Sequence, residues 1–213
     1  MNPPSKIRSV TLLELLTAVV LITVIILGIT SIEVFSRFHV LSSDRRAKLQ
    51  NEASVALEHM TKNISQAIGN TVNDPAVRAY ADNKGIRIRI DRSIIDGSSN
   101  GRADAADTWI AYRHENIGIP PTDSEIRFYA NAGNTETPAG SFQSIARKVV
   151  ISTPSVYGLE FLGNFNDQRW LVDRIIEVKV TCRWDPRSIA LASVDNPEVT
   201  MRTKIEMPSM SGS

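Results

Sequence analysis

The feature that most constrains this chain is an uncharged apolar run over residues 15–32, with Glu14 before it and Glu33 after it. A helix of about 20 apolar residues crosses the hydrocarbon core of a bilayer, so the run has a suitable length and composition. A secretory signal peptide is the other explanation, but its apolar region has roughly 7–15 residues and a small-residue cleavage site follows it. No such site follows Ile32. The sequence therefore predicts a transmembrane helix.

Glu14 is an unusual residue for the start of such a helix. A carboxylate near hydrocarbon costs about 2.5–3.5 kcal/mol on insertion scales, so its presence needs a reason. The cost falls when a positive group from a neighbouring helix neutralises the charge. A plain single-pass anchor with an accidental glutamate is the alternative. Glu14 is therefore a candidate for contact with another chain.

The residues around Glu14 resemble the class III signal of type IV prepilins. Residues 9–16 read Ser-Val-Thr-Leu-Leu-Glu-Leu-Leu and follow a short basic leader. In this family a prepilin peptidase cuts after a small residue and methylates the new N-terminus. The resemblance implies a cut between Ser9 and Val10, where the family commonly has glycine and phenylalanine. It also implies that Glu14, fifth in the mature chain, pairs with the N-terminal amine of a neighbouring subunit.

Beyond the apolar run, the spacing of apolar residues predicts that the helix continues. Apolar residues recur every three or four positions from Leu49 to Ile68, and a Gly-Asn pair at 69–70 provides a stop. A helix from Val10 to Ile68 would be about 90 Å long. Residues 42–44, Ser-Ser-Asp, offer the alternative of a cap that begins a second helix.

After residue 70 the sequence changes to short alternating runs separated by turn residues, which predict about seven strands. The predicted strands contain residues 86–90, 110–112, 126–128, 149–151, 159–161, 176–184 and 199–205. Their short connections favour antiparallel pairing. The sequence therefore predicts an α+β fold in which a long N-terminal helix packs on an antiparallel β-sheet head.

This plan resembles that of the larger minor pilins and pseudopilins, the W type of pili and the J type of type II secretion. The predicted parts follow the chain in order. They are a cytoplasmic leader (1–9), a transmembrane assembly helix (10–33), its amphipathic continuation (34–69), a β-rich globular head (70–207) and a flexible tail (208–213).

One loop has the spacing of a calcium site. Residues 96–107 match a twelve-residue EF-hand-type loop, and they also resemble the calcium loop of dockerin modules. Oxygen ligands would come from the side chains of Asp96, Ser98, Asn100, Asp104 and Asp107 and from the backbone carbonyl of Arg102. A bound Ca²⁺ would be structural, holding a long loop between two strands. A Gly/Ser/Asn-rich hairpin connection without metal is the alternative.

Composition argues against several other classes of function. The chain has 24 basic and 23 acidic residues, and this balance gives no reason to expect a nucleic-acid partner. The single cysteine, Cys182, excludes an internal disulfide. Neither a P-loop nor a G-x-G-x-x-G motif occurs, and no pair of histidines has metal-ligand spacing. We therefore expect a protein that is not an enzyme.

The resemblance implies a minor pilin or pseudopilin, a structural subunit of a type IV pilus or a type II secretion pseudopilus, incorporated at its tip. Such a subunit first spans the inner membrane once, with its head in the periplasm, and then enters a periplasmic or extracellular filament. Its partners would be other pilin or pseudopilin subunits, the prepilin peptidase and the inner-membrane assembly platform. The sequence does not separate these filaments from a DNA-uptake filament. The alternative is a membrane-anchored envelope domain that binds a ligand or acts as an enzyme without polymerising.

Overall fold

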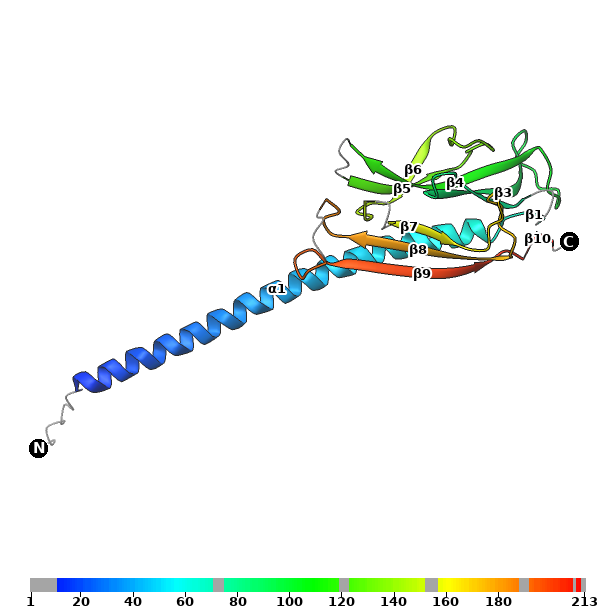
Figure 1. The fold of residues 1–213 in the computed structure, drawn as a ribbon. Helices are drawn as coiled ribbons and strands as arrows, with labels where there is room; N and C mark the ends of the chain where they lie inside the picture. The colour runs from blue at the N-terminus through cyan, green and yellow to red at the C-terminus, as the bar shows by residue number, and fades with distance from the viewer. Residues whose placement is uncertain are drawn as a thin grey trace, which may run out of the picture. The chain divides into compact units, whose positions relative to one another are not determined.

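The computed structural model describes residues 11–70, 75–118, 123–151, 157–187, 192–208 and 210–211 (Figure 1). The chain divides into two compact units, Met1–Ser43 and Asp44–Ser213. The predicted leader and both predicted processing residues, Ser9 and Val10, lie outside the described residues.

A single helix, α1 (Leu12–Ile64), accounts for all the described helical structure. It contains residues 42–44, so the alternative of a second helix beginning there is wrong. It also ends four residues before the predicted end at Ile68. The chain leaves the helix there because Ala67 forms a bridge with Ile90 and the Ile68 N–H donates to the Arg89 carbonyl at 2.9 Å.

The head contains two antiparallel sheets and one short parallel pair. The five-stranded sheet has the order β2 (Val77–Ala79), β3 (Gly85–Ser93), β4 (Asp107–Ile117), β5 (Asp123–Tyr129) and β6 (Phe142–Ala146). The three-stranded sheet has the order β7 (Leu159–Leu162), β8 (Ile175–Arg183) and β9 (Glu198–Glu206). The parallel pair joins β1 (Gly69–Asn70) to β10 (Met210–Ser211), so residues 210–211 of the predicted flexible tail are paired.

One cluster of buried side chains joins the second part of α1 to both sheets. The helix contributes Leu49, Ala53, Ala56, Leu57, Met60 and Ile64, at the three- and four-residue spacing of one helix face. Alternating residues of the strands, such as Ile86 and Ile88 in β3, supply the opposite side. Figure 1 shows this cyan part of α1 beside β7, β8 and β9.

The predicted α+β class and antiparallel sheets are confirmed, and six of the predicted strands correspond to β3, β4, β5, β7, β8 and β9. The predicted strand at 149–151 is reduced to one bridge between Val149 and Cys182. The sequence analysis missed β6, because only Ala146 of its five residues is buried and no alternating pattern results.

Candidate functional site

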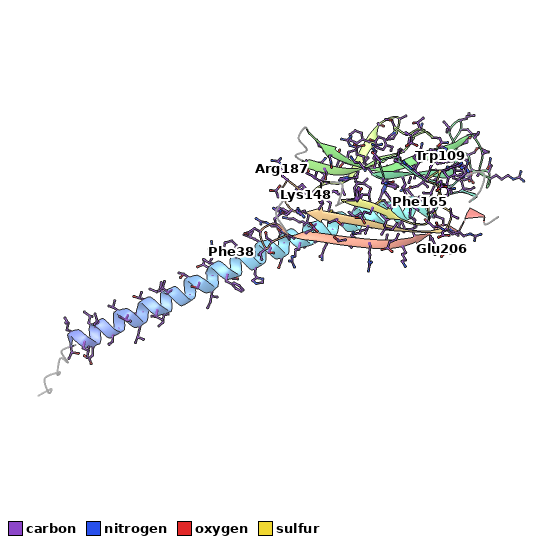
Figure 2. The ribbon with its side chains drawn as sticks, viewed as in Figure 1. Phe38, Trp109, Lys148, Phe165, Arg187 and Glu206 are labelled. Atoms are coloured by element: carbon purple, nitrogen blue, oxygen red, sulfur yellow. The ribbon has the colours of Figure 1, made fainter. Side chains whose placement is uncertain are left out.

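The first part of α1 has an apolar surface that no part of its own unit covers. Every large apolar side chain from Leu12 to Leu41 is between 51% and 87% exposed. Figure 2 shows Phe38 and its neighbours projecting outward from the helix. This is the one described helix that is long and apolar enough to cross a membrane. Water is a poor environment for such a surface, since each fully buried Leu, Ile or Val side chain contributes about 1.5–3 kcal/mol.

Four hydroxyl groups in this segment bond within the helix itself. Each donates a hydrogen bond to a backbone carbonyl three or four residues earlier, at 2.8–3.0 Å. The donors are Thr17, Thr23, Thr30 and Ser31. Their polarity therefore does not prevent the segment from lying in lipid or against other helices.

Glu14 has a partner inside the chain that the sequence analysis missed. Its Oε2 accepts hydrogen bonds from the Thr11 N–H at 2.9 Å and the Thr11 hydroxyl at 3.0 Å. In return, the Glu14 N–H donates to Thr11 Oγ1 at 3.2 Å. This reciprocal arrangement is a capping box, and the spacing Thr-x-x-Glu is its local sequence signal. Glu14 therefore helps to begin α1, and its predicted pairing with a neighbouring subunit stays a prediction.

The predicted calcium loop lies between β3 and β4, and its side chains bond mainly to one another and to the backbone of the loop. Asp96 Oδ1 accepts from the N–H and the hydroxyl of Ser98 at 3.0 and 2.7 Å. The Asn100 amide donates to Asp104 Oδ2 at 2.7 Å, and the Arg102 N–H donates to Asn100 Oδ1 at 2.8 Å. These are local turns of the kind that Asx residues favour.

Asp107, the last predicted ligand, is buried at the start of β4. One of its oxygens accepts from the Asp104 N–H at 2.7 Å and lies 3.9 Å from Arg89 Nε. Burial raises the pKa of Asp107. Within the described ranges no three His, Cys, Asp or Glu side chains are grouped as metal ligands. A cation at Asp107 would also be close to the charge of Arg89. Calcium binding stays a prediction from the spacing.

Asp91, which the sequence analysis did not single out, organises this loop. Its carboxylate accepts from the Ser99 hydroxyl at 2.6 Å, the Asn100 N–H at 3.0 Å and the Gly101 N–H at 2.7 Å. The bond from Ser99 is the main reason why the pKa of Asp91 is lowered. Because these partners are eight to ten residues away, no short motif identifies Asp91.

Residues 97–101, Gly-Ser-Ser-Asn-Gly, also fit the G-x-S-x-G pattern of serine hydrolases. That pattern requires a sharp turn from a strand into a helix, which exposes the serine hydroxyl. Here Ser99 lies in a connection between two antiparallel strands, and its hydroxyl donates to Asp91. The match therefore lacks the structural context of a catalytic nucleophile.

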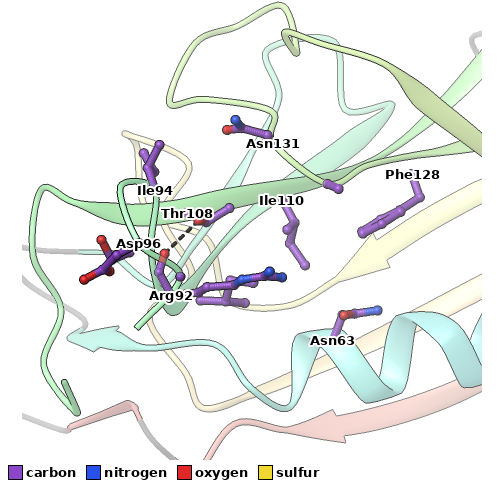
Figure 3. Close-up of a pocket in the computed structure, with 12 residues that line it drawn as sticks. Asn63, Arg92, Ile94, Asp96, Thr108, Ile110, Phe128 and Asn131 are labelled. Atoms are coloured by element: carbon purple, nitrogen blue, oxygen red, sulfur yellow. Dashed lines mark hydrogen bonds between the residues drawn. The ribbon is translucent and has the colours of Figure 1, made fainter. Parts of the chain in front are cut away.

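A cavity of about 570 Å³ lies between this loop and the end of α1 (Figure 3). Ile110 and Phe128 supply apolar lining, and Asn63 and Arg92 supply polar groups. Asn63 Nδ2 donates to the His59 carbonyl at 2.8 Å and to the Tyr112 hydroxyl at 2.9 Å. Since the bond to Tyr112 attaches the helix end to β4, we interpret Asn63 as a structural residue at the edge of the cavity.

Neither a protein-family model nor a curated protein matches the chain. The features that bear on function are therefore those of the chain itself. These are the exposed apolar part of α1, the position of Glu14 at its start, and the resemblance carried by residues 9–16.

Proposed function

We propose that the chain is a minor pilin or pseudopilin, a structural and non-catalytic subunit that assembles into a filament through the first part of α1. In this proposal a prepilin peptidase processes the chain between Ser9 and Val10. The chain first spans the inner membrane with its head in the periplasm. An inner-membrane assembly platform then transfers it into a pilus or a secretion pseudopilus, at the tip.

The observation that carries the proposal is the exposed apolar surface from Leu12 to Leu41. Lipid can cover that surface while the chain is in the membrane. Apolar helices of neighbouring subunits can cover it in a filament, so that the same residues serve both states. A membrane anchor without polymerisation remains the competing function, and the exposed surface alone is compatible with it.

Glu14 is what favours assembly over simple anchoring. Its capping box uses Oε2 for both bonds from Thr11, and a carboxylate has a second oxygen that accepts hydrogen bonds. An amine from the next subunit can therefore approach Glu14 without opening the cap. In an apolar surrounding such a charge pair is favourable only if both partners are present.

The test separates the charge of Glu14 from its capping role. Glu14→Gln keeps the capping box, since glutamine is also suitable at this position, but removes the charge. Thr11→Ala removes the cap, at a cost of about 1 kcal/mol of helix stability, and keeps the charge. In the native cells, filaments are sheared off or extracted and immunoblotted for the chain, alongside the membrane fraction.

We expect Glu14→Gln to accumulate in the membrane and to be missing from filaments. Thr11→Ala should enter filaments at close to the wild-type level. Normal incorporation of Glu14→Gln would contradict the assembly role of the charge. Absence of the wild-type chain from every filament fraction would favour the membrane-anchored alternative.

A further inference from the structure

The outer face of the five-stranded sheet has an unusual surface of arginines and aromatic rings. In β3, Ile86 and Ile88 face the core, so the alternation of a strand places Arg87 and Arg89 on the opposite face. The guanidinium carbons lie 4.0–5.6 Å from ring centroids. The pairs are Arg87 and Arg113 with Tyr80, Arg89 with Trp109, and Arg127 with Phe142.

Arg87 and Tyr80 are the most deeply buried members of this surface, each 1% exposed. Arg87 Nη2 donates to Glu136 Oε1 at 2.7 Å. Among the described residues, the Tyr80 hydroxyl and Arg87 Nε have no hydrogen-bond partner. A buried guanidinium without a counter-charge costs several kcal/mol, so this site needs an anion.

Glu136 supplies that anion from an exposed segment. It belongs to residues 130–141, which connect β5 to β6, and its side chain is 55% exposed. Its second oxygen accepts from the Ala81 N–H at 3.1 Å. Partial burial opposes ionisation, but the Ala81 N–H and the charge of Arg87 outweigh it and lower the pKa of Glu136. The carboxylate therefore stays ionised in its site.

The segment that carries Glu136 has the features of a movable flap. Gly133 and Gly140 flank Glu136 with φ angles of 66° and 84°, a region that glycine adopts at little cost. The base of the flap is closed by a hydrogen bond from the Ala139 N–H to the Ala132 carbonyl at 2.9 Å. Two bonds join the flap to β4, from the Ala132 N–H to the Trp109 carbonyl at 2.7 Å and from Arg113 Nη1 to the Glu136 carbonyl at 3.4 Å. The counter-charge of a buried arginine thus lies on a loop, while the arginine itself lies on a central strand.

The neighbouring arginine is neutralised separately. Arg113 lies 2.7 Å from Asp82 and 2.6 Å from Glu115, so it does not depend on Glu136 for a counter-charge. Arg78, in contrast, lies directly opposite Arg87 in the β2–β3 register and adds positive charge there. Departure of Glu136 would therefore leave a positive site at Arg87.

We propose that Arg87, Tyr80 and the Ala81 N–H form a carboxylate-binding site that Glu136 occupies within the same chain, and that a carboxylate from another molecule replaces it when the flap opens. The ligand chemistry follows from the occupant. One guanidinium N–H and one backbone N–H each bind one oxygen of a planar carboxylate. The Tyr80 ring supports the same guanidinium, whose carbon lies 5.0 Å from the ring centroid. This site is independent of assembly through α1.

The experiment is a chemical rescue with acetate as the probe. The full chain in detergent micelles is melted while tryptophan fluorescence is recorded, in sodium acetate and in sodium chloride of equal ionic strength. Glu136→Ala should lower the midpoint by several degrees, because Arg87 loses its counter-charge. Acetate should then raise the midpoint of the variant well beyond the effect of chloride, by binding to the folded state.

Two controls make the result specific. The wild-type chain, whose site is filled, and Glu206→Ala, which removes an exposed glutamate from β9, should respond equally to acetate and chloride. Should Glu136→Ala fail to fold, Glu136→Gln provides the same comparison with the shape of the side chain retained. If acetate shifted the melting midpoint equally in all variants, the proposed carboxylate-binding site at Arg87 would be overturned. A larger rescue by phosphate than by acetate would overturn its carboxylate specificity.

Discussion

The two parts of α1 differ in how they use the same secondary structure. From Asp44 to Ile64 the helix has one apolar face, and Leu49, Ala53 and Met60 on that face are fully buried in the head. From Leu12 to Leu41 apolar side chains occur all around the helix and all of them are exposed. A helix that is apolar on every side is stable only when something surrounds it.

The contrast indicates where the partner of each part lies. The amphipathic part finds its partner within the chain, in the β-sheets of its own head. The apolar part finds no partner within its own unit, and we propose that lipid or other subunits cover it. The head should therefore respond to changes in its core and its titrating groups, while the apolar part should respond to changes in its surroundings.

The largest expected effect comes from a charge placed in each part. Met60→Asp buries an uncompensated carboxylate in the core and should cost more than about 5 kcal/mol, enough to abolish cooperative melting of the head. Ile25→Asp, the matched variant on the exposed part, should leave the melting of the head unchanged in micelles. It should make the free energy of membrane insertion in cells less favourable by about 2.5–3.5 kcal/mol on insertion scales. Loss of head folding in Ile25→Asp would contradict this difference between the two parts of α1.

Acid should act on the head through His114. Burial, aided by the charge of Lys84, lowers the pKa of this fully buried histidine to about 4. The unfolded chain takes up the proton near pH 6.5, before the folded head does. The head therefore has its full free energy of unfolding above pH 6.5. That free energy decreases as the pH falls toward 4, by about 3 kcal/mol at most.

The measurement is urea unfolding of the head in micelles at several pH values. His114→Gln should flatten the pH dependence relative to wild type. His39→Gln, which changes an exposed histidine on the apolar part of the helix, should preserve it. A wild-type slope in His114→Gln would show that other groups cause the acid sensitivity.

Calcium should have the smallest effect. Asp107 is already beside Arg89, and side-chain oxygens of Asp96, Asn100 and Asp104 already accept hydrogen bonds. We therefore expect calcium to raise the melting midpoint only slightly above its value in EDTA. A rise of several degrees in calcium, lost in Asp96→Asn, would show that the loop rearranges around the ion as its spacing predicts.

The sequence predicts local features of this protein better than distant ones. The apolar run and the alternation in β3 and β8 can be recognised in the sequence, because each pattern lies within a single helix or strand. The capping box of Thr11 and Glu14 is equally local, and its Thr-x-x-Glu spacing can also be recognised in the sequence. The contact of Arg87 with Glu136 joins residues 49 apart, and only the folded sheet brings them together.

The predicted calcium loop shows why ligand spacing alone does not identify a metal site. The spacing of residues 96–107 suits an ion, but the sequence does not show that Asp91 lies close enough to accept three bonds from the same loop. Nor does it show that Arg89 lies beside Asp107. Ligand spacing describes what a loop is able to do, and its neighbours decide which partners its oxygens have.

The mature N-terminus distinguishes an assembly helix from a plain anchor in the apolar part of α1. Mass spectrometry of the chain purified from native membranes should find an N-methylated Val10 as the first residue. An intact Met1, or a new N-terminus beyond Ile32, would contradict the assembly role.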